Sequence, residues 1–150
     1  MKVYLGADHR GVAFKSKVKA ILSSMKIHFE DLGTNDETTS CDYPVSAYQV
    51  ASKVAKNKNS KGILVCMSGI GQAIAANKVK GAYAALCYNA AAAQLSRQHN
   101  NANVLVLSAK FVNPSEIRKI LTAFLTTEFE GGRHLRRFKQ IQRIEKLQKI

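Results

Sequence analysis

The sequence feature that most constrains the fold is an unbroken apolar run, Ile63 to Cys66, which follows Lys61-Gly62. A strand with one face in water alternates apolar and polar residues, whereas a strand inside a parallel sheet is covered on both faces and is apolar throughout. Helices must then pack above and below this strand, and the rest of the chain has to supply them. The run therefore predicts a protein of the α/β class.

Short apolar runs alternate with helical periodicity along the rest of the chain. We expect further strands at about 3–7, 27–31, 82–87 and 104–107. We expect helices at about 12–25, 44–55, 71–77 and 89–98, and one more whose apolar stripe runs from Ile117 to Leu125. Pro44 opens one of these helices after a polar loop over 34–42. This order predicts a single three-layer domain over residues 1–150 with a five-stranded parallel sheet.

The last segment, about 133–150, carries Phe138, Ile141, Ile144 and Leu147 at intervals of three, against a basic opposite face. This spacing predicts a projecting amphipathic helix at the C-terminal end. Its apolar stripe has two possible partners, the core of its own domain or a neighbouring subunit.

The formal net charge of +13 predicts attraction to polyanions or to anionic substrates. Near the end of the chain one acid, Glu145, accompanies a group of cations: Arg133, Arg136, Arg137, Lys139, Arg143, Lys146 and Lys149. Nucleic-acid binding is therefore an alternative function from another class. The basic stretch holds only two aromatic residues, Phe129 and Phe138, and no known nucleic-acid-binding module, so we expect nucleic acid not to be the main partner.

The cellular compartment follows from two features of the sequence. No apolar run is long enough to span a membrane, and the N-terminus is charged too soon to be a signal peptide. Cys41, Cys66 and Cys87 lie far apart in sequence, which favours neither a disulfide framework nor a zinc site. We expect a cytoplasmic protein with reduced thiols.

The first candidate site is Gly6-Ala7-Asp8-His9-Arg10-Gly11, where the first strand ends and the first helix begins. Ligands of open parallel sheets bind at this edge. Asp8 could accept hydrogen bonds from ligand hydroxyls or orient a neighbouring group, and His9 could meet a phosphate beside the helix N-terminus. Alternatively, Asp8 only caps the helix.

The second candidate site is Cys66-Met67-Ser68-Gly69-Ile70-Gly71-Gln72, directly after the apolar strand. Its glycines allow backbone N–H groups to point at one spot, and the helix behind them adds a partial positive charge that suits an oxyanion. The same field should favour the thiolate of Cys66, which would make this thiol a usable base near neutral pH. A small buried cysteine before an ordinary glycine turn is the alternative. Nucleotide binding is not expected, because the segment lacks both the dinucleotide fingerprint and the P-loop lysine.

Two more sites lie in the second half of the chain. His99 precedes Asn100 and can shuttle protons near neutrality, or it is a solvated residue at the end of a helix. Arg133 and Arg137 stand four apart and so share a helical face. They form either a phosphate clamp or part of a solvated basic helix.

Taken together, these segments resemble the ribose-5-phosphate isomerase B family, which also includes galactose-6-phosphate isomerase subunits. The resemblance covers essentially the whole chain, and its remaining motifs are Asp42-Tyr43-Pro44, Ala75-Ala76-Asn77-Lys78, Gln94-Leu95-Ser96-Arg97-Gln98-His99-Asn100, Asn103-Val104-Leu105 and Glu130-Gly131-Gly132-Arg133-His134. It implies a Rossmann-like fold, assembled as a homodimer or a dimer of dimers with shared active sites. It also implies a phosphosugar substrate and no metal or organic cofactor. The implied activity is the interconversion of ribose 5-phosphate and ribulose 5-phosphate through an enediolate, a reaction of the pentose phosphate pathway.

The resemblance implies roles for individual residues as well. Cys66 matches the base that moves a proton between the two reacting carbons, and Ser68 matches a hydroxyl that assists proton transfer at the oxygens. His99 matches the acid/base that opens the furanose ring, aided by Asp8 and Tyr43. The other matches are an anion hole formed by the amides of Met67, Ser68, Gly69, Ile70 and Gly71, phosphate ligands His9, Arg133 and Arg137, and Asn100 as a substrate contact reached across a subunit boundary.

Two positions depart from the family pattern. Met67 stands where glycine is usual and could narrow the pocket or alter the backbone of the loop. Lys110 stands where arginine is common, which turns a possible bidentate phosphate contact into a point charge. Another phosphosugar, galactose 6-phosphate or allose 6-phosphate, is therefore an alternative substrate. The retained Cys66 and His99 favour a catalytically complete chain.

Overall fold

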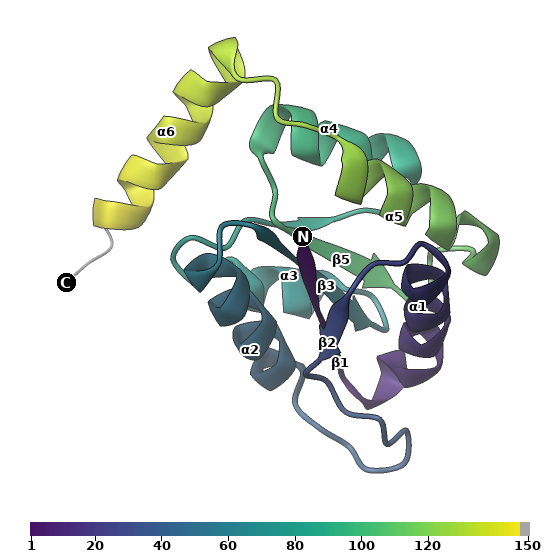
Figure 1. Cartoon of the computed structure of the whole chain (residues 1–150). Helices are drawn as coiled ribbons and strands as arrows, with labels where there is room; N and C mark the ends of the chain where they lie inside the picture. Colours follow the sequence, from purple (N-terminus) through teal and green to yellow (C-terminus); the bar gives the residue numbers. More distant parts are fainter. Residues whose placement is uncertain (148–150) are drawn as a thin grey trace.

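A computed structural model describes residues 1–147, and its sheet has five strands in the order β2-β1-β3-β5-β4 (Figure 1). All neighbouring strands are parallel. The strands are β1 (Lys2–Ala7), β2 (Phe29–Asp31), β3 (Ser60–Cys66), β4 (Ala84–Leu86) and β5 (Val104–Ser108). The predicted α/β class and the five-stranded parallel sheet are confirmed.

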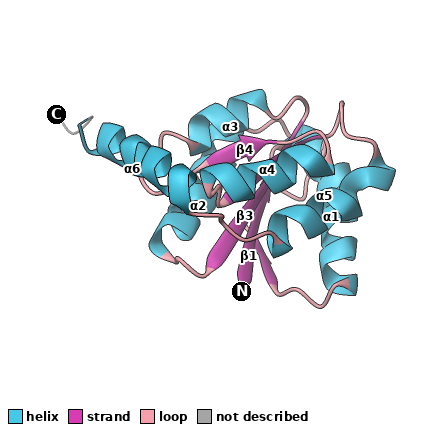
Figure 2. Ribbon diagram, turned by 90° about the horizontal axis from the view of Figure 1, so that it is seen from above, coloured by secondary structure: helices cyan, strands magenta, loops and turns pink. Residues whose placement is uncertain are grey.

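Helices cover both faces of the sheet (Figure 2). Side chains of α1, α4 and α5 pack on one face, and side chains of α2 and α3 pack on the other. The helices are α1 (Val12–Ser24), α2 (Tyr43–Lys56), α3 (Ile70–Ala76), α4 (Ala90–Asn100), α5 (Ile117–Thr126) and α6 (Gly132–Leu147), with short 3-10 turns η1 (His9–Gly11) and η2 (Pro114–Glu116). Within residues 1–147, no helix combines the length and the apolar character needed to cross a membrane.

The central strand β3 is buried on both faces, as its apolar run predicts. Ile63 and Val65 belong to the core under α1 and α5, whereas Leu64 belongs to the core under α2 and α3. None of the three side chains is exposed. Burying an aliphatic side chain of this size stabilises the fold by about 1.5–3 kcal/mol. Both cores therefore hold in place the strand that ends at Cys66.

The parallel direction gives the sheet two distinct edges. All strands end at one edge, the carboxyl edge, and begin at the other, the amino edge. Helix α4 starts after β4 at the carboxyl edge and runs back to Asn100, shortly before β5 begins at Val104. From Val104 to Ser108, β5 advances about 13 Å, at roughly 3.3 Å per residue. Because Ser108 pairs with Cys66, residues at the end of α4 lie at the edge opposite to Cys66.

The loop over 32–42 extends from the carboxyl edge, at the bottom of Figure 1. Its first residues are fixed by Lys15, whose side chain is fully buried. The Lys15 ammonium donates to Asp31 Oδ1 at 2.8 Å and to the carbonyl oxygen of Thr34 at 2.6 Å. This anchor holds the loop that leads to Cys41 and Tyr43.

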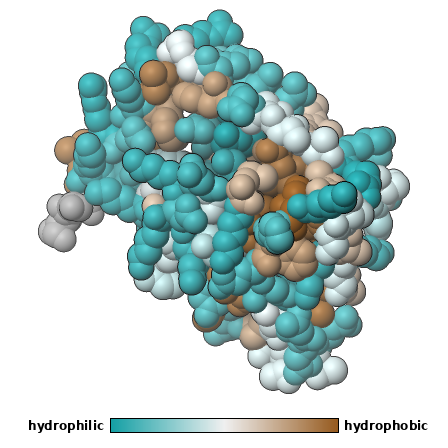
Figure 3. Space-filling model, viewed as in Figure 1, coloured by the Kyte–Doolittle hydropathy of each residue, from teal (hydrophilic) through white to brown (hydrophobic). Residues whose placement is uncertain are grey.

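Helix α6 confirms the predicted terminal helix as far as Leu147, and residues 148–150 of that prediction lie outside the described part. Phe138 is buried, with its ring centroid 4.7 Å from Tyr83 and 5.8 Å from Phe129. Glu145 accepts a hydrogen bond from the amide of Gly81 at 2.7 Å. The helix thus packs on its own chain, yet several of its apolar side chains stay exposed among hydrophilic ones (Figure 3): Leu135, Ile141, Ile144 and Leu147.

Candidate active site

Asp8 and Cys66 meet at the carboxyl edge because they end neighbouring strands. Ala7 pairs with Val65, so Asp8, which follows β1, lies beside Cys66, the last residue of β3. The thiol of Cys66 donates to Asp8 Oδ2 at 2.9 Å, while the amide of Gly11 donates to Asp8 Oδ1 at 3.0 Å. Asp8 caps η1 and also contacts Cys66, so the alternative in which it only caps a helix is wrong.

Cys66 is held as a thiol in this arrangement. Burial and, next, the hydrogen bond and charge of Asp8 raise the pKa of Cys66 to about 11, while the amides of Gly69 and Met67 lower it. The amides favour the thiolate, as predicted. The expectation that this makes the thiol a usable base near neutral pH is wrong for the free protein, because lost hydration and a carboxylate 2.9 Å away outweigh the amides. To act as a base, Cys66 must first pass its proton to an acceptor, and Asp8 Oδ2 is already in contact.

Gly69 gives the loop after Cys66 its shape. Its φ is +82°, and a Cβ at this position would stand 2.5 Å from Cδ1 of Leu86, so only glycine fits. The next turn is closed by Ser68, whose Oγ accepts a hydrogen bond from the amide of Ile70 at 3.3 Å. Of the five amides predicted to form the anion hole, that of Ile70 thus donates to Ser68, and those of Met67 and Gly69 act on the sulfur of Cys66.

Tyr43 lies directly over the start of α3. A Cβ on Gly71 would stand 2.5 Å from Cζ of Tyr43 and 2.9 Å from its hydroxyl oxygen, so a larger residue would displace the ring. Tyr43 begins α2, and Pro44 in the first turn fixes the direction of entry. Tyr43 therefore lies against the glycine loop at the carboxyl edge, and its predicted part in ring opening with His99 stays a prediction.

His9 contacts the long loop through its Nδ1 atom. The amide of Cys41 donates to His9 Nδ1 at 3.2 Å, and Cys41 Sγ lies 4.0 Å from the same nitrogen. A ring nitrogen that accepts carries no hydrogen, so the neutral ring has its hydrogen on Nε2. That hydrogen is left to donate to an anion. Cys41 was missed by sequence reasoning, because it lies in a polar loop without a motif.

The two departures from the family pattern lie side by side. The carbonyl oxygen of Met67 accepts from the amide of Lys110 at 3.1 Å and from Ser108 Oγ at 2.7 Å. Among residues 1–147, the non-glycine residues with positive φ are Lys26 and Asn101, so Met67 leaves the backbone of the loop unstrained. Lys110 is exposed, and its ammonium lies 5.5 Å from the ring centroid of Phe111.

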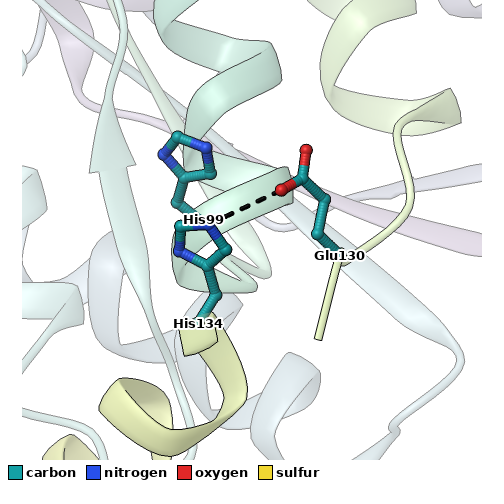
Figure 4. A group of neighbouring side chains, drawn as sticks. All are labelled: His99, Glu130 and His134. Carbon is teal, nitrogen blue, oxygen red and sulfur yellow. Dashed lines mark ion pairs between the residues drawn. The ribbon is translucent and has the colours of Figure 1, made fainter. Parts of the chain in front are cut away.

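His99 lies at the amino edge, near the end of α4. Its imidazole ring stacks on that of His134 in α6, with centroids 4.1 Å apart and planes only 4° from parallel (Figure 4). Glu130 points at this pair from the side, and its Oε2 lies 3.5 Å from His134 Nε2. His99 is half-buried, so the alternative of a fully solvated residue is wrong.

The other amino-edge residues surround this stack. The amide of Glu130 donates to the carbonyl oxygen of Gln98, which ties the start of α6 to the end of α4. Asn100 is the exposed last residue of α4, and Asn101 ends the helix in the left-handed conformation. Arg133 and Arg137 are exposed on α6. Their predicted placement on one helix is confirmed, and their phosphate role stays a prediction.

The predicted site residues thus form two groups within one chain. The carboxyl-edge group comprises Asp8, His9, Tyr43, Cys66, Met67, Ser68, Gly69, Ile70, Gly71 and Lys110. The amino-edge group comprises His99, Asn100, Arg133 and Arg137. The resemblance implied that only Asn100 reaches a substrate across a subunit boundary. The topology places His99, Arg133 and Arg137 at the same edge of the sheet as Asn100.

His134 and Glu130 belong to the amino-edge group and were missed as functional residues. Both stand within a motif quoted from the sequence, and their separation of four residues was the signal that could have paired them. Burial lowers the pKa of His134, and the neighbouring His99 and Arg133 lower it further.

His99, Glu130 and His134 bring three possible metal-ligand atoms within 4.8 Å of one another. Two observations argue against a divalent ion between them. The in-plane lone pairs of two parallel rings do not converge on one point, and Nε of Arg133 lies 3.4 Å from Nε2 of His134. A guanidinium at that distance repels a cation.

Comparison with known proteins bears on the whole chain. The family model described as Ribose/Galactose Isomerase matches residues 3–141. The chain is 46% identical over 145 residues to the probable ribose-5-phosphate isomerase B of Mycoplasma genitalium, covering 96% of this chain and 95% of that protein. It is 41% identical over 145 residues to ribose-5-phosphate isomerase B of Escherichia coli, with 96% of each chain covered.

Solved structures share the fold. The crystal structure of ribose-5-phosphate isomerase B from Mycoplasma genitalium with bound ribulose-5-phosphate superposes with a TM-score of 0.92 at 46% identity, covering 97% of this chain and 96% of that one. The enzyme of the same name from Thermotoga maritima superposes with a TM-score of 0.90 at 42% identity, covering 95% and 97%.

Proposed function

The chain belongs to the ribose/galactose isomerase family, and we propose on that premise that it interconverts ribose 5-phosphate and ribulose 5-phosphate. One observation carries the proposal beyond family membership. A thiol and a carboxylate stand 2.9 Å apart at the carboxyl edge, beside a glycine loop that presents backbone amides. This is the equipment that an aldose–ketose isomerase needs, because the reaction only moves protons next to a carbonyl.

The reaction proceeds through an enediolate. A base removes the proton from carbon 2 of the open-chain aldose, and the electron pair moves toward carbon 1, whose oxygen becomes negatively charged. Carbon 1 then receives a proton, and the proton of the hydroxyl on carbon 2 passes to the oxygen on carbon 1, so that carbon 1 carries a hydroxyl and carbon 2 carries the carbonyl. Atoms and electrons balance without an external oxidant or reductant.

Cys66 acts as the base after its own proton has moved to Asp8 Oδ2. The raised pKa of the thiol keeps the sulfur protonated in the free protein, and the amides of Gly69 and Met67 favour the thiolate. A thiolate of high proton affinity is also a strong base, which suits removal of a weakly acidic proton from carbon. Ser68, two residues further along the loop, serves the oxygens of the enediolate.

The glycine loop stabilises the charge that forms on the sugar. Backbone donors fixed before reaction need no reorganisation, and removing one such donor costs about 3 kcal/mol in comparable sites. Leu86 and Tyr43 fill the space that a Cβ on Gly69 or Gly71 would need, so the loop has little room to relax. Preorganisation therefore comes from packing of neighbouring elements on these two glycines.

The amino-edge group supplies ring opening and phosphate binding. His99 protonates the ring oxygen of the furanose, while Arg133 and Arg137 hold the phosphate together with His9 and Lys110, and Asn100 contacts the sugar. Guanidinium groups suit this task, because their planar donors match phosphate oxygens in pairs.

Two copies of the chain are needed for both groups to meet one substrate. Within one chain the groups lie at opposite edges of the sheet, so a partner has to bring its amino edge to this carboxyl edge. The carboxyl edge carries exposed apolar side chains that a partner would cover: Tyr43, Ile70, Ile74, Tyr88 and Phe111. These observations support our proposal of a homodimer or a dimer of dimers with shared active sites. Free thiols at all three cysteines suit a reducing cytoplasm.

The test is a panel of phosphosugars offered to the purified chain. We expect turnover of ribose 5-phosphate and of ribulose 5-phosphate in the reverse direction, with lower kcat/KM for galactose 6-phosphate and allose 6-phosphate. A clear preference for a hexose phosphate would replace the ribose assignment and keep the mechanism. Absence of turnover on every member of the panel would refute an isomerase of these sugars.

A further inference from the structure

The stacked pair of His99 and His134 carries an inference that rests on the proposed function. His134 is buried, whereas His99 is half-buried and free to face a substrate. Their rings lie 4.1 Å apart and nearly parallel, so each ring feels the charge on the other (Figure 4). Two adjacent imidazolium rings would repel each other, which favours at most one positive charge on the pair.

The Nε2 atom of His134 has a suitable neighbour whether or not it carries a hydrogen. On one side, Glu130 Oε2 lies 3.5 Å away and can receive a hydrogen from Nε2. On the other side, Nε of Arg133 donates toward the same nitrogen at 3.4 Å and suits a ring without that hydrogen. His134 can therefore gain or lose a proton without stranding a buried polar atom.

We propose that His134 is a positioning residue for His99, and that Glu130 is the counterion through which this pair keeps a proton available for ring opening. The stack fixes the plane of the His99 ring, and His134 adjusts its own charge as His99 gives and regains its proton. Neither His134 nor Glu130 is proposed to touch the substrate.

Ring opening is the step that needs such a device. His99 gives a proton to the ring oxygen as the bond between that oxygen and carbon 1 breaks. The hydroxyl on carbon 1 loses its proton, the carbonyl forms there, and the proton returns to His99. The charge on His99 thus falls and rises within one turnover, next to a neighbour that can compensate.

Charged groups face the pair from each element packed against it. Arg133 and Arg137 of α6 disfavour a positive charge on His134, and Glu130, from the segment before α6, favours it. Glu130 is the one acid among these three charged residues, so its removal should lower the affinity of the His99–His134 pair for a proton. Loss of the His134 imidazole should therefore have a larger effect than loss of the Glu130 charge.

The experiment uses the full chain with His134→Phe, which keeps a flat ring for stacking, and with Glu130→Gln, which keeps size but loses charge. Each variant is assayed with ribose 5-phosphate that carries hydrogen or deuterium on carbon 2. We expect kcat to fall roughly ten- to a hundredfold in His134→Phe, less than most of the ~10²–10⁴ that general acid–base catalysis contributes, because His99 itself is retained. For Glu130→Gln we expect a fall of roughly twofold to fivefold, as for a partly exposed ion pair.

The isotope effect separates positioning from a merely structural role. When ring opening becomes slower than proton abstraction, deuterium on carbon 2 no longer matters, so the isotope effect should shrink toward unity in both variants and in His99→Asn. Glu128→Gln, an exposed acid on the same segment, is the matched control and should keep wild-type values. Turnover by the wild type tests the proposed function separately.

Two results would overturn the inference. One is a lowered kcat with an undiminished isotope effect, which would place the damage in the proton-transfer step at Cys66. The other is unchanged kcat in both variants. If His134→Phe fails to fold, as shown by its thermal unfolding, Glu130→Gln decides alone, because Glu130 is exposed.

Discussion

The two edges of the sheet hold their functional groups in different ways. At the carboxyl edge, Asp8 and Cys66 are 5% and 8% exposed and are fixed by strand ends. At the amino edge, Arg133 and Arg137 are exposed on a projecting helix (Figure 1). The difference suggests that the two edges have different roles. The carboxyl edge, which we call the rigid edge, performs proton transfer on carbon, and the amino edge, with its projecting helix, captures the phosphate and opens the ring.

The largest expected effect comes from removing the base at the rigid edge. Cys66→Ala should lower kcat by ~10²–10⁴ or more, because the group proposed to take the proton from carbon is removed. Substrate affinity, measured by calorimetry with the inactive variant, should stay close to the wild type. Cys87→Ala is the matched control, since Cys87 is also a buried free thiol. A near-normal rate in Cys66→Ala would remove the carboxyl edge from the chemistry.

Mixing two inactive chains tests whether the edges of different copies cooperate. Cys66→Ala damages one edge and His99→Asn the other, so a hybrid dimer has one site with both groups intact. Random mixing should restore about a quarter of the wild-type activity, because about half of the dimers are hybrids with one intact site in two. The measurement is kcat per chain after joint refolding or co-expression.

The control for that experiment mixes Cys66→Ala with Asp8→Asn. Both defects lie at the carboxyl edge, so every site of a hybrid keeps one of them, and kcat per chain should stay at the average of the two variants. Restoration in this control, or none in the first mixture, would contradict a site shared between opposite edges.

The sequence was informative about the rigid edge. The apolar run ending at Cys66 predicts a central strand, and strand ends of a parallel sheet converge, so Asp8 and Cys66 could be expected together. The protonation state of Cys66 could not be read from the loop, because it depends on burial and on a carboxylate 58 residues away in the chain.

At the other edge the sequence held a signal that was overlooked. His99 and Asn100 end a helix just before the strand that begins at Val104, which places them at the amino edge of any parallel sheet. The separation from Cys66 follows from that order alone. The stacking of His99 on His134 could not be foreseen, since it depends on how α6 returns to α4.

Asp8→Asn should raise the reactivity of the Cys66 thiol at the rigid edge. Asparagine keeps the cap on Gly11 but removes the negative charge, so the pKa of Cys66 should fall from about 11. Each unit of that fall raises the thiolate fraction near pH 8 about tenfold. We expect alkylation of Cys66 by iodoacetamide, followed by peptide mass spectrometry, to become roughly threefold faster or more.

Cys87 provides an internal control in the same protein. Burial raises its pKa to about 11 as well, but without help from Asp8, so its alkylation rate should not respond to Asp8→Asn. In both variants the rate should climb as the pH rises toward that value, because the thiolate is the reactive form. Equal acceleration at both cysteines would mean a loosened fold instead of a local charge effect.

The smallest expected effect is on KM, and it tests whether Lys110 of the rigid edge contributes to phosphate binding. Lys110 is anchored beside the glycine loop by its amide, and only its side chain reaches into solvent. Lys110→Arg should keep the stacking on Phe111 and add a bidentate donor, lowering KM for ribose 5-phosphate about twofold to fivefold at constant kcat. Lys119→Arg, at a lysine paired with Glu116, is the control and should change neither constant. An unchanged KM in Lys110→Arg would leave His9 as the proposed phosphate ligand of the carboxyl edge, beside the arginines of the amino edge, and so make the division between the two edges sharper.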